Sequence, residues 1–527
     1  MREGRPEPVA RHHPISEAPP LTPPLPTAVL RRPSRPRTVA FAGLALVGLA
    51  LVGLALVSLA LTGGPASAGS ATPRPAPTTT PRKAPARKST PVRPATRPPD
   101  ILLITVDTLR PDRLPFGGCA LNTAPFLDSL AAGAVICERT YSVSSWTLPA
   151  LASLHTGLYP ASHGTTHGMV KGTVVMGQET LPTAQPTLAE IMRRRGYLTL
   201  AVVANSHLTP GWGFERGFDR FICVNFMAAN VVNDSLRALR AEIEDRSRPL
   251  FLWVHYFDPH HPYRTQQPWF DQLHPEIPRG RLQFAESVMS NWNNPPPMAQ
   301  QHMGTLMNTA KALYDSEIRA TDQQIRAIWT EFPRLSECFL AFTADHGEEF
   351  REHQSTTHGH NLFDTTVRVP LFLRPPGGGR PDTLRGVVSL VDVPPTLTAL
   401  AGARIPSNWA GAVLYRAGAA TPPPAERSVM AELDRNPAST LLKAWIGPRW
   451  KLIQDLKTQQ SQLYDLQADP GETQNLARQE PARAALELAA LKRCLADLPV
   501  SPPMSPERLK AMTPEVIQML KSLGYLN

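Results

Sequence analysis

Four runs of apolar residues recur along the chain, at 101–106, 197–204, 249–256 and 339–343. Continuous runs of this length are typical of parallel strands that are buried on both faces. Residues 187–196 precede the second run and show the periodicity and closing glycine of an amphipathic helix. Strands that alternate with helices predict an α/β fold with a doubly wound, mostly parallel central sheet flanked by helices.

Side chains suited to metal binding or acid–base chemistry follow three of these runs. Asp107 comes directly after the first run, and Asp345 and His346 follow the last. The third run ends in a cluster of His255, Asp258, His260 and His261. Because open α/β sheets bind ligands at the carboxyl ends of their strands, the three groups predict one shared site.

A hydroxyl group precedes a predicted helix between the first two runs. Pro149 suits the first turn of that helix, and we expect Thr147 to lie just before it, near the N-cap. A helix N-terminus offers free amide donors and the positive end of the helix dipole to an anion. Thr147 is therefore either an ordinary cap or a group that faces an anionic substrate.

The first hundred residues predict a tether. Residues 1–37 are a Pro- and Arg-rich tail that we expect to be disordered. An uncharged run follows, and we expect a transmembrane signal anchor over 38–63, then a Pro/Thr/Ala/Lys/Arg-rich linker over 64–99. Basic residues before the span favour a cell-membrane protein with an extracytoplasmic body. Cleavage of a signal peptide near 66–68 is the alternative, and it also exports the body.

The net charge of +10 belongs to this tether. Residues 1–99 hold 14 Lys+Arg against 3 Asp+Glu, and the remaining residues hold 40 against 41. A body with almost no net charge argues against nucleic-acid binding, so we expect no nucleic-acid partner. The five cysteines lack CxxC spacing and predict neither a zinc ribbon nor a disulfide framework, although one or two disulfides stay open.

Several motifs together resemble the sulfatase family of the alkaline phosphatase superfamily. They include ITVDTLRPD at 104–112, TLPALASLHTG at 147–157, HYFDPHHPY at 255–263, TADHGEE at 343–349 and SLVDVPPTL at 389–397. Their order and spacing agree with the family over nearly all of residues 100–527. The resemblance implies an ester hydrolase with a catalytic domain over 100–402 and a small α+β subdomain over 403–527.

The resemblance also implies a divalent metal ion bound by Asp107, Asp345, His346 and the hydroxyl of Thr147. Phosphate and sulfate esters repel an anionic nucleophile, so a cation is needed to neutralise charge and to lower the pKa of the nucleophile. Oxygen donors with one imidazole suit Mn²⁺, Mg²⁺, Ca²⁺ or Zn²⁺, and the choice among them stays open.

The number of metal ions is open as well. Asp258, His260 and His358 could hold a second ion, because dimetal members of the superfamily use Asp/His/His ligands there. With a single ion, His255 and His260 become ligands of the substrate anion or general acids.

Two positions depart from the sulfatase pattern. Sulfatases make formylglycine from Cys or Ser in a C/S-x-P-x-R context, whereas this chain has Thr147 and, at the arginine position, Leu151. The extra methyl of threonine should prevent oxidation to the aldehyde, so no formylglycine is expected. Threonine here resembles the superfamily's phosphodiesterases, phosphonate hydrolases and phosphoglycol transferases. Thr108 replaces a second aspartate, which makes a four-carboxylate calcium site doubtful.

The C-terminal part is predicted to serve packing. Residues 450–453 and 462–466 predict two strands of a small antiparallel sheet, as the resemblance implies. Residues 482–495 have the pattern of an amphipathic helix, and residues 506–523 predict a last helix.

The leading hypothesis is an exported, membrane-tethered metallohydrolase that cleaves phosphate mono- or diesters, or phosphonate esters, through Thr147. A sulfuric ester hydrolase is the first alternative, a phosphoglycol or phosphoethanolamine transferase the second, and an inactive binding module the third. The expected partner is a small or polymer-linked anionic ester. The oligomeric state is open.

Overall fold

The structure is a computed structural model, and it describes residues 97–166, 177–225, 228–290, 296–416, 418–436, 440–499 and 509–511. All of them belong to one compact unit, Thr90–Asn527. The predicted tail and membrane span, and the linker up to residue 96, lie outside the described residues. Within the described ranges, no helix combines the length and apolarity needed to cross a membrane. The anchor and its location therefore stay predictions.

A nine-stranded sheet forms the centre of the molecule, in the order β10-β2-β11-β7-β1-β6-β4-β5 with β12 paired to β2. Its strands are β1 Ile101–Val106, β2 Val135–Tyr141, β4 Leu198–Val203, β5 Arg220–Cys223, β6 Leu250–Tyr256, β7 Phe339–Ala344, β10 Arg368–Val369, β11 Leu371–Arg374 and β12 Asp382–Ser389. The run from β7 to β5 is parallel throughout, and β10 and β11 are antiparallel to their neighbours. The predicted mostly parallel α/β sheet is confirmed.

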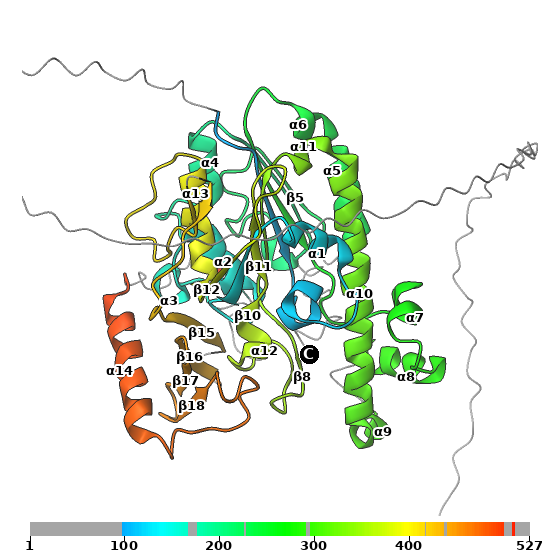
Figure 1. Ribbon diagram of the computed structural model, residues 1–527, viewed down its shortest axis with the longest axis vertical. Helices are drawn as coiled ribbons and strands as arrows, with labels where there is room; N and C mark the ends of the chain where they lie inside the picture. Colours follow the sequence, from blue (N-terminus) through cyan, green and yellow to red (C-terminus); the bar gives the residue numbers. More distant parts are fainter. Residues whose placement is uncertain are drawn as a thin grey trace, which may run out of the picture. The chain divides into compact units, whose positions relative to one another are not determined.

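Helices cover both faces of the sheet, which explains the uninterrupted apolar runs (Figure 1). In β1, Leu102 and Ile104 pack with α1 Pro125–Ala131, α5 Ala229–Ala238 and α10 Met303–Glu331. Ile101 and Leu103 point to the opposite face, against α2 Thr147–Thr156, α4 Leu188–Arg194 and α13 Val393–Leu400. Successive side chains of a strand alternate between faces, so each must be apolar when both faces are covered. Burial of each such side chain contributes about 1.5–3 kcal/mol.

The C-terminal part forms a second, antiparallel sheet. Its strands are β15 Val429–Asn436, β16 Thr440–Ile446, β17 Trp450–Asp455 and β18 Ser461–Asp465, and α14 Pro481–Asp497 packs against them. Leu491 of α14 is buried with Leu452 and Leu463 of the sheet. The predicted strands and the predicted helix over 482–495 are thus present.

The predicted helix over 506–523 is wrong at Leu509–Ala511. These residues form β19, which pairs in antiparallel fashion with β3 Gly177–Glu179. A distant strand supplies backbone partners here, and such tertiary pairing overrides local helical preference. The rest of 506–523 lies outside the described residues.

Short elements complete the described chain. The α-helices are α3 Pro160–His163, α6 Arg240–Glu244, α7 Trp269–Leu273, α8 Arg279–Ser290, α9 Pro297–Gln301, α11 Pro333–Ser336 and α12 Asp364–Val367. The 3₁₀ helices are η1 Pro111–Arg113, η2 Pro115–Gly117, η3 Ser206–Leu208 and η4 Leu390–Asp392. The remaining strands are β8 Glu349–Phe350, β9 Thr356–Thr357, β13 Tyr415–Arg416 and β14 Ala419–Ala420. All five cysteines are free thiols, so the open question of disulfides is answered within the chain.

Candidate active site

The carboxyl ends of three adjacent parallel strands bring the predicted ligands together. Thr105 of β1 is in register with His255 of β6, and Val106 is in register with Ala344 of β7. Asp107 and Asp345 therefore leave the sheet side by side, one residue past these pairs. Asp107, His255 and Asp345 are completely buried, and their ligand atoms all lie within 4.8 Å of one another.

Thr147 reaches the same place from the start of helix α2. The helix begins at Thr147 itself, because the extended Trp146 takes the N-cap position, so the expected place just before the helix is off by one residue. Thr147 is almost fully buried, and its Oγ1 lies 3.3 Å from Nε2 of His346. The amides of the first helical turn have no partners within the helix and can receive an anion's oxygens.

Three oxygen donors, from the ends of β1 and β7 and the start of α2, lie around Nε2 of His346. Nε2 of His346 lies 3.4 Å from Oδ1 of Asp107 and 3.5 Å from Oδ2 of Asp345, in addition to the contact with Thr147. Ligands bound to a small divalent cation at about 2.0–2.2 Å lie roughly 3.3–3.6 Å apart in tetrahedral geometry. The separations therefore fit the ligand set expected from the sequence.

Three buried acceptors of this group have no hydrogen-bond partner among the described residues. They are Oδ1 of Asp107, Oδ2 of Asp345 and Nε2 of His255. A buried polar atom without a partner costs about 1–3 kcal/mol, and a cation would satisfy all three at once. The residues present therefore fit a divalent metal ion.

The ionisation of Asp107 and Asp345 also agrees with a bound cation. Burial opposes the charge of Asp107, but the neighbouring imidazoles of His260, His255 and His346 lower its pKa to about 2. Burial and the negative charge of Asp107 raise the pKa of Asp345 to about 6. Two carboxylates so close together are both ionised at neutral pH most readily beside a cation.

Hydrogen bonds fix the orientation of both carboxylates. Nδ2 of Asn205 donates to Oδ2 of Asp107 at 2.7 Å, and the amides of Thr108 and His346 donate to Oδ1 of Asp345 at 3.2 and 2.8 Å. Asn205 was not among the predicted site residues. It lies two residues after the end of β4, so the rule that ligands lie at strand ends could have found it.

Thr108 contributes its backbone rather than its side chain. Its φ of 56° lies in the left-handed region, which is an outlier for a β-branched residue. The Tyr314 hydroxyl donates to its carbonyl at 2.7 Å and holds this conformation. Such strain costs of the order of 1–3 kcal/mol and is concentrated at functional sites.

The predicted histidines line up next to His346. The ring of His358 lies 4.4 Å from that of His346 and 4.9 Å from that of His260, between centroids, and His260 stacks on Phe257. Nδ1 of His358 lies 3.0 Å from Oε1 of Glu348. The structure therefore brings His260 and His358 towards the metal ligands.

Asp258 differs from these histidines. Its Oδ2 accepts a hydrogen bond from the amide of Ala229 at 3.1 Å, and burial raises its pKa to about 6. In the described part of the chain, the group of closely spaced metal donors does not include Asp258. Its role in a second metal site stays a prediction.

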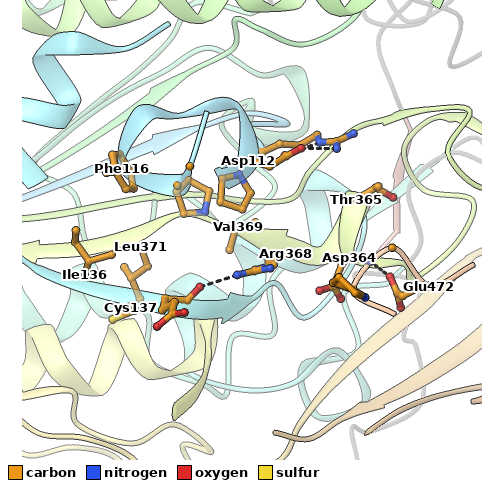
Figure 2. A pocket seen from close by; sticks show the side chains of 18 of the residues that line it. Asp112, Phe116, Ile136, Cys137, Asp364, Thr365, Arg368, Val369, Leu371 and Glu472 are labelled. Carbon is orange, nitrogen blue, oxygen red and sulfur yellow. Dashed lines mark hydrogen bonds and ion pairs between the residues drawn. The ribbon is translucent and has the colours of Figure 1, made fainter. Parts of the chain in front are cut away.

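A cavity of about 700 Å³ lies outside this site (Figure 2). Its lining includes Arg110, Glu352, His353, Asp364, Arg368 and Glu472. None of Asp107, Thr147, His255, Asp345 or His346 lines it. Figure 2 shows Glu472 beside Asp364 on its wall.

The fold and the strand-end group define an α/β protein with a candidate metal-binding site. A family model described as Sulfatase matches residues 99–403, and one described as N-sulphoglucosamine sulphohydrolase, C-terminal, matches residues 358–499. The chain belongs to the sulfatase family, whose members hydrolyse esters, and is in that sense an ester hydrolase.

Three known proteins illustrate the similarity. Human arylsulfatase A is 27% identical over 369 residues, which cover 59% of this chain and 66% of that protein. The phosphonate monoester hydrolase of Agrobacterium radiobacter has a TM-score of 0.60 at 20% identity and covers 76% of this chain and 95% of its own. BT4656, solved in complex with its substrate D-glucosamine-2-N,6-O-disulfate, has a TM-score of 0.61 at 18% identity and covers 76% and 97%. At these identities the two structures show the fold alone.

Proposed function

We propose that this protein hydrolyses phosphate mono- or diesters, or phosphonate esters, with unmodified Thr147 as the nucleophile. One observation carries the proposal: Oγ1 of Thr147, at the first residue of α2, lies 3.3 Å from Nε2 of His346 within the group of buried ligands. A threonine in this position supplies an alkoxide oxygen and no aldehyde.

Each group at the site has a separate role in the proposed reaction. A bound divalent cation supplies charge neutralisation and promotes ionisation of the hydroxyl. Oγ1 of Thr147 then forms a bond to phosphorus while the bond to the leaving oxygen breaks, and water later hydrolyses the threonine ester. The amides at the start of α2 stabilise the equatorial oxygens. Nδ1 of His260 contacts the carbonyl oxygen of His261, so proton transfer to the leaving group would use Nε2.

Sulfuric ester hydrolysis is the second candidate, and family membership favours it. The surroundings of Thr147 argue against sulfuric ester hydrolysis. Leu151, one turn along α2, is completely buried among apolar residues and offers no charge to a sulfate at the position where the family pattern has arginine. Threonine also lacks the aldehyde hydrate that expels sulfate.

Two variants and a substrate panel test the proposal. We expect T147A to lower kcat/KM for an aryl phosphodiester by about 10³-fold or more, and T147S to retain part of the activity. T156A is the matched control, because Thr156 is a buried threonine at the other end of α2 whose Oγ1 donates to the carbonyl of Ala152 at 2.7 Å.

Aryl phosphate, phosphodiester, phosphonate and sulfate esters are then compared on the wild-type protein, and the peptide that contains Thr147 is weighed by mass spectrometry. An aldehyde at residue 147, or sulfatase activity far above every phosphoryl activity, would contradict the proposal. Unchanged activity in T147A would remove Thr147 from the mechanism.

A further inference from the structure

His255 is hydrogen-bonded to a hydroxyl that is itself held by an indole. Oγ1 of Thr105 lies 2.8 Å from Nδ1 of His255, and Nε1 of Trp253 donates to the same oxygen at 3.0 Å. All three residues are completely buried. Thr105 and His255 are register partners on β1 and β6, and Trp253 precedes His255 by two residues on the same face of β6. The strand pairing therefore fixes the arrangement.

Two tautomers of His255 fit these distances, and only one of them suits a metal ligand. An indole N–H is only a donor, so Oγ1 of Thr105 accepts from Trp253. The single hydroxyl hydrogen of Thr105 can go to the carbonyl of Val254, 3.4 Å away. Oγ1 then accepts a second hydrogen bond, from Nδ1–H of His255, and the lone pair of the ring is at Nε2.

The other tautomer would turn the ring N–H towards Asp107 and leave no lone pair there for a metal ion. It would place N–H at Nε2 of His255, 3.5 Å from Oδ2 of Asp107, which already accepts from Asn205. Nε2 of His255 makes no hydrogen bond within the described residues. A lone pair at Nε2, beside the equally unpartnered oxygens of Asp107 and Asp345, is what a cation requires.

His346 shows the same arrangement. Its Nδ1 lies 2.9 Å from the carbonyl oxygen of Gly347, which leaves Nε2 to face Asp107 and Asp345. Metal-binding histidines generally donate the second ring N–H to an oxygen acceptor in this way. For His255, that acceptor is the Thr105 hydroxyl.

We infer that Thr105, held by Trp253, positions His255 as a second imidazole ligand of the divalent cation. The inference rests on the metal centre of the proposed function and extends it. Thr105 and Trp253 are positioning residues, because they touch the ligand and not the reacting atoms. Two imidazoles with two carboxylates favour a Zn²⁺-type ion over Ca²⁺, which takes oxygen ligands.

The test uses the full chain loaded with Mn²⁺ as a spectroscopic probe. Mn²⁺ affinity is measured by calorimetric titration, and directly bound nitrogens are counted from ¹⁴N couplings in electron–nuclear double resonance. We expect two imidazole couplings in the wild type. T105V should lose or weaken one of them and lower the affinity by about 10–100-fold, and T105S should restore both. W253F, which removes the indole donor together with part of the buried ring, should give a smaller loss of the same kind.

T199V is the matched control. Thr199 is also completely buried in the central sheet, and its Oγ1 donates to the carbonyl of Gly217 at 2.8 Å, on β4 rather than at the site. It should change neither affinity nor couplings. If T105V fails to fold, W253F provides the same comparison.

The outcomes separate the inference from the proposed function. A wild type that binds Mn²⁺ with a single nitrogen coupling overturns the inference and leaves the proposed function standing. A wild type that binds no divalent ion overturns the metal centre itself. Unchanged affinity and couplings in T105V and W253F overturn the positioning role.

Discussion

Two buried groups of charged residues lie in this protein, and they differ in how their charges are satisfied. At the strand ends, Asp107 and Asp345 lie beside histidines, with one oxygen of each unpartnered. Beside the cavity of Figure 2, Nζ of Lys451 lies 2.8 Å from Asp364 and 2.7 Å from Glu472.

The second group contains its own cation, since Lys451 forms ion pairs with both carboxylates, although Oε1 of Glu472 makes no hydrogen bond. The remaining oxygen of Asp364 accepts from the Tyr141 hydroxyl at 3.3 Å, and Oε2 of Glu472 accepts from the amide of Asp364. Lys451 comes from β17 and Asp364 from α12, so the group joins the C-terminal sheet to the catalytic part. Carboxylates that are paired with a buried lysine of the chain indicate structure, whereas two buried carboxylates that have only histidines beside them indicate a site for an added cation.

The largest effect is expected from a substitution in the first group, at the strand ends. D345N removes one ligand charge, and we expect kcat/KM to fall by about 10³-fold or more because the cation is lost. The metal-free variant should be at least as stable as the metal-free wild type, because a buried carboxylate next to Asp107 is gone. Steady-state kinetics and urea unfolding in chelator measure both. Full activity in D345N would exclude this carboxylate as a ligand.

The next largest effect is expected from a substitution of Lys451 in the second group. K451M leaves Asp364 and Glu472 buried without their cation, and we expect a loss of about 3–5 kcal/mol in unfolding free energy. The affinity for metal should be unchanged in the protein that remains folded. Urea unfolding gives the first quantity and calorimetric titration the second. K492M, at an exposed lysine of α14, should change stability by no more than about 0.5 kcal/mol.

The second group should also make the stability of the protein depend on pH. Burial and the negative charge of Asp364 outweigh the opposing effect of Lys451 and raise the pKa of Glu472 from 4.5 to about 7. The folded protein therefore holds this proton more tightly than the unfolded chain, and stability falls as pH rises from about 4.5 to 7. E472Q should remove about 3 kcal/mol of that decline. Unfolding midpoints across this range measure it, and an unchanged slope in E472Q would refute the assignment.

The smallest effect comes from Asn205. N205A keeps Asp107 but frees it to rotate, so we expect affinity for the metal to fall by about tenfold. N233A removes an equally buried amide, bonded to the Tyr256 hydroxyl at 2.9 Å, and should leave affinity unchanged. Equal affinities in the two variants would remove Asn205 from the site.

The sequence predicts the strand-end ligands well because strand order and burial follow from local pattern. Asp107 and Asp345 directly follow apolar runs, and parallel neighbours must end at the same edge of the sheet. Thr105 and Trp253 were not predicted, because inside a buried strand their polar atoms look like any other core residue. Only the register between β1 and β6 shows that they share His255.

The second group could not be predicted from the sequence for a related reason. Lys451, Asp364 and Glu472 come from separate segments, and no local pattern relates them. β19 shows the same limit, since its partner β3 lies more than 300 residues earlier in the chain.

Whether the strand-end group binds a metal ion is decided by the metal content of the purified full-length protein, measured by inductively coupled plasma mass spectrometry alongside D345N and K451M. We expect a stoichiometrically bound divalent ion in the wild type and in folded K451M, and none in D345N. A fully active wild type that contains no metal, or a D345N variant that retains it, would show that the group is not a metal site.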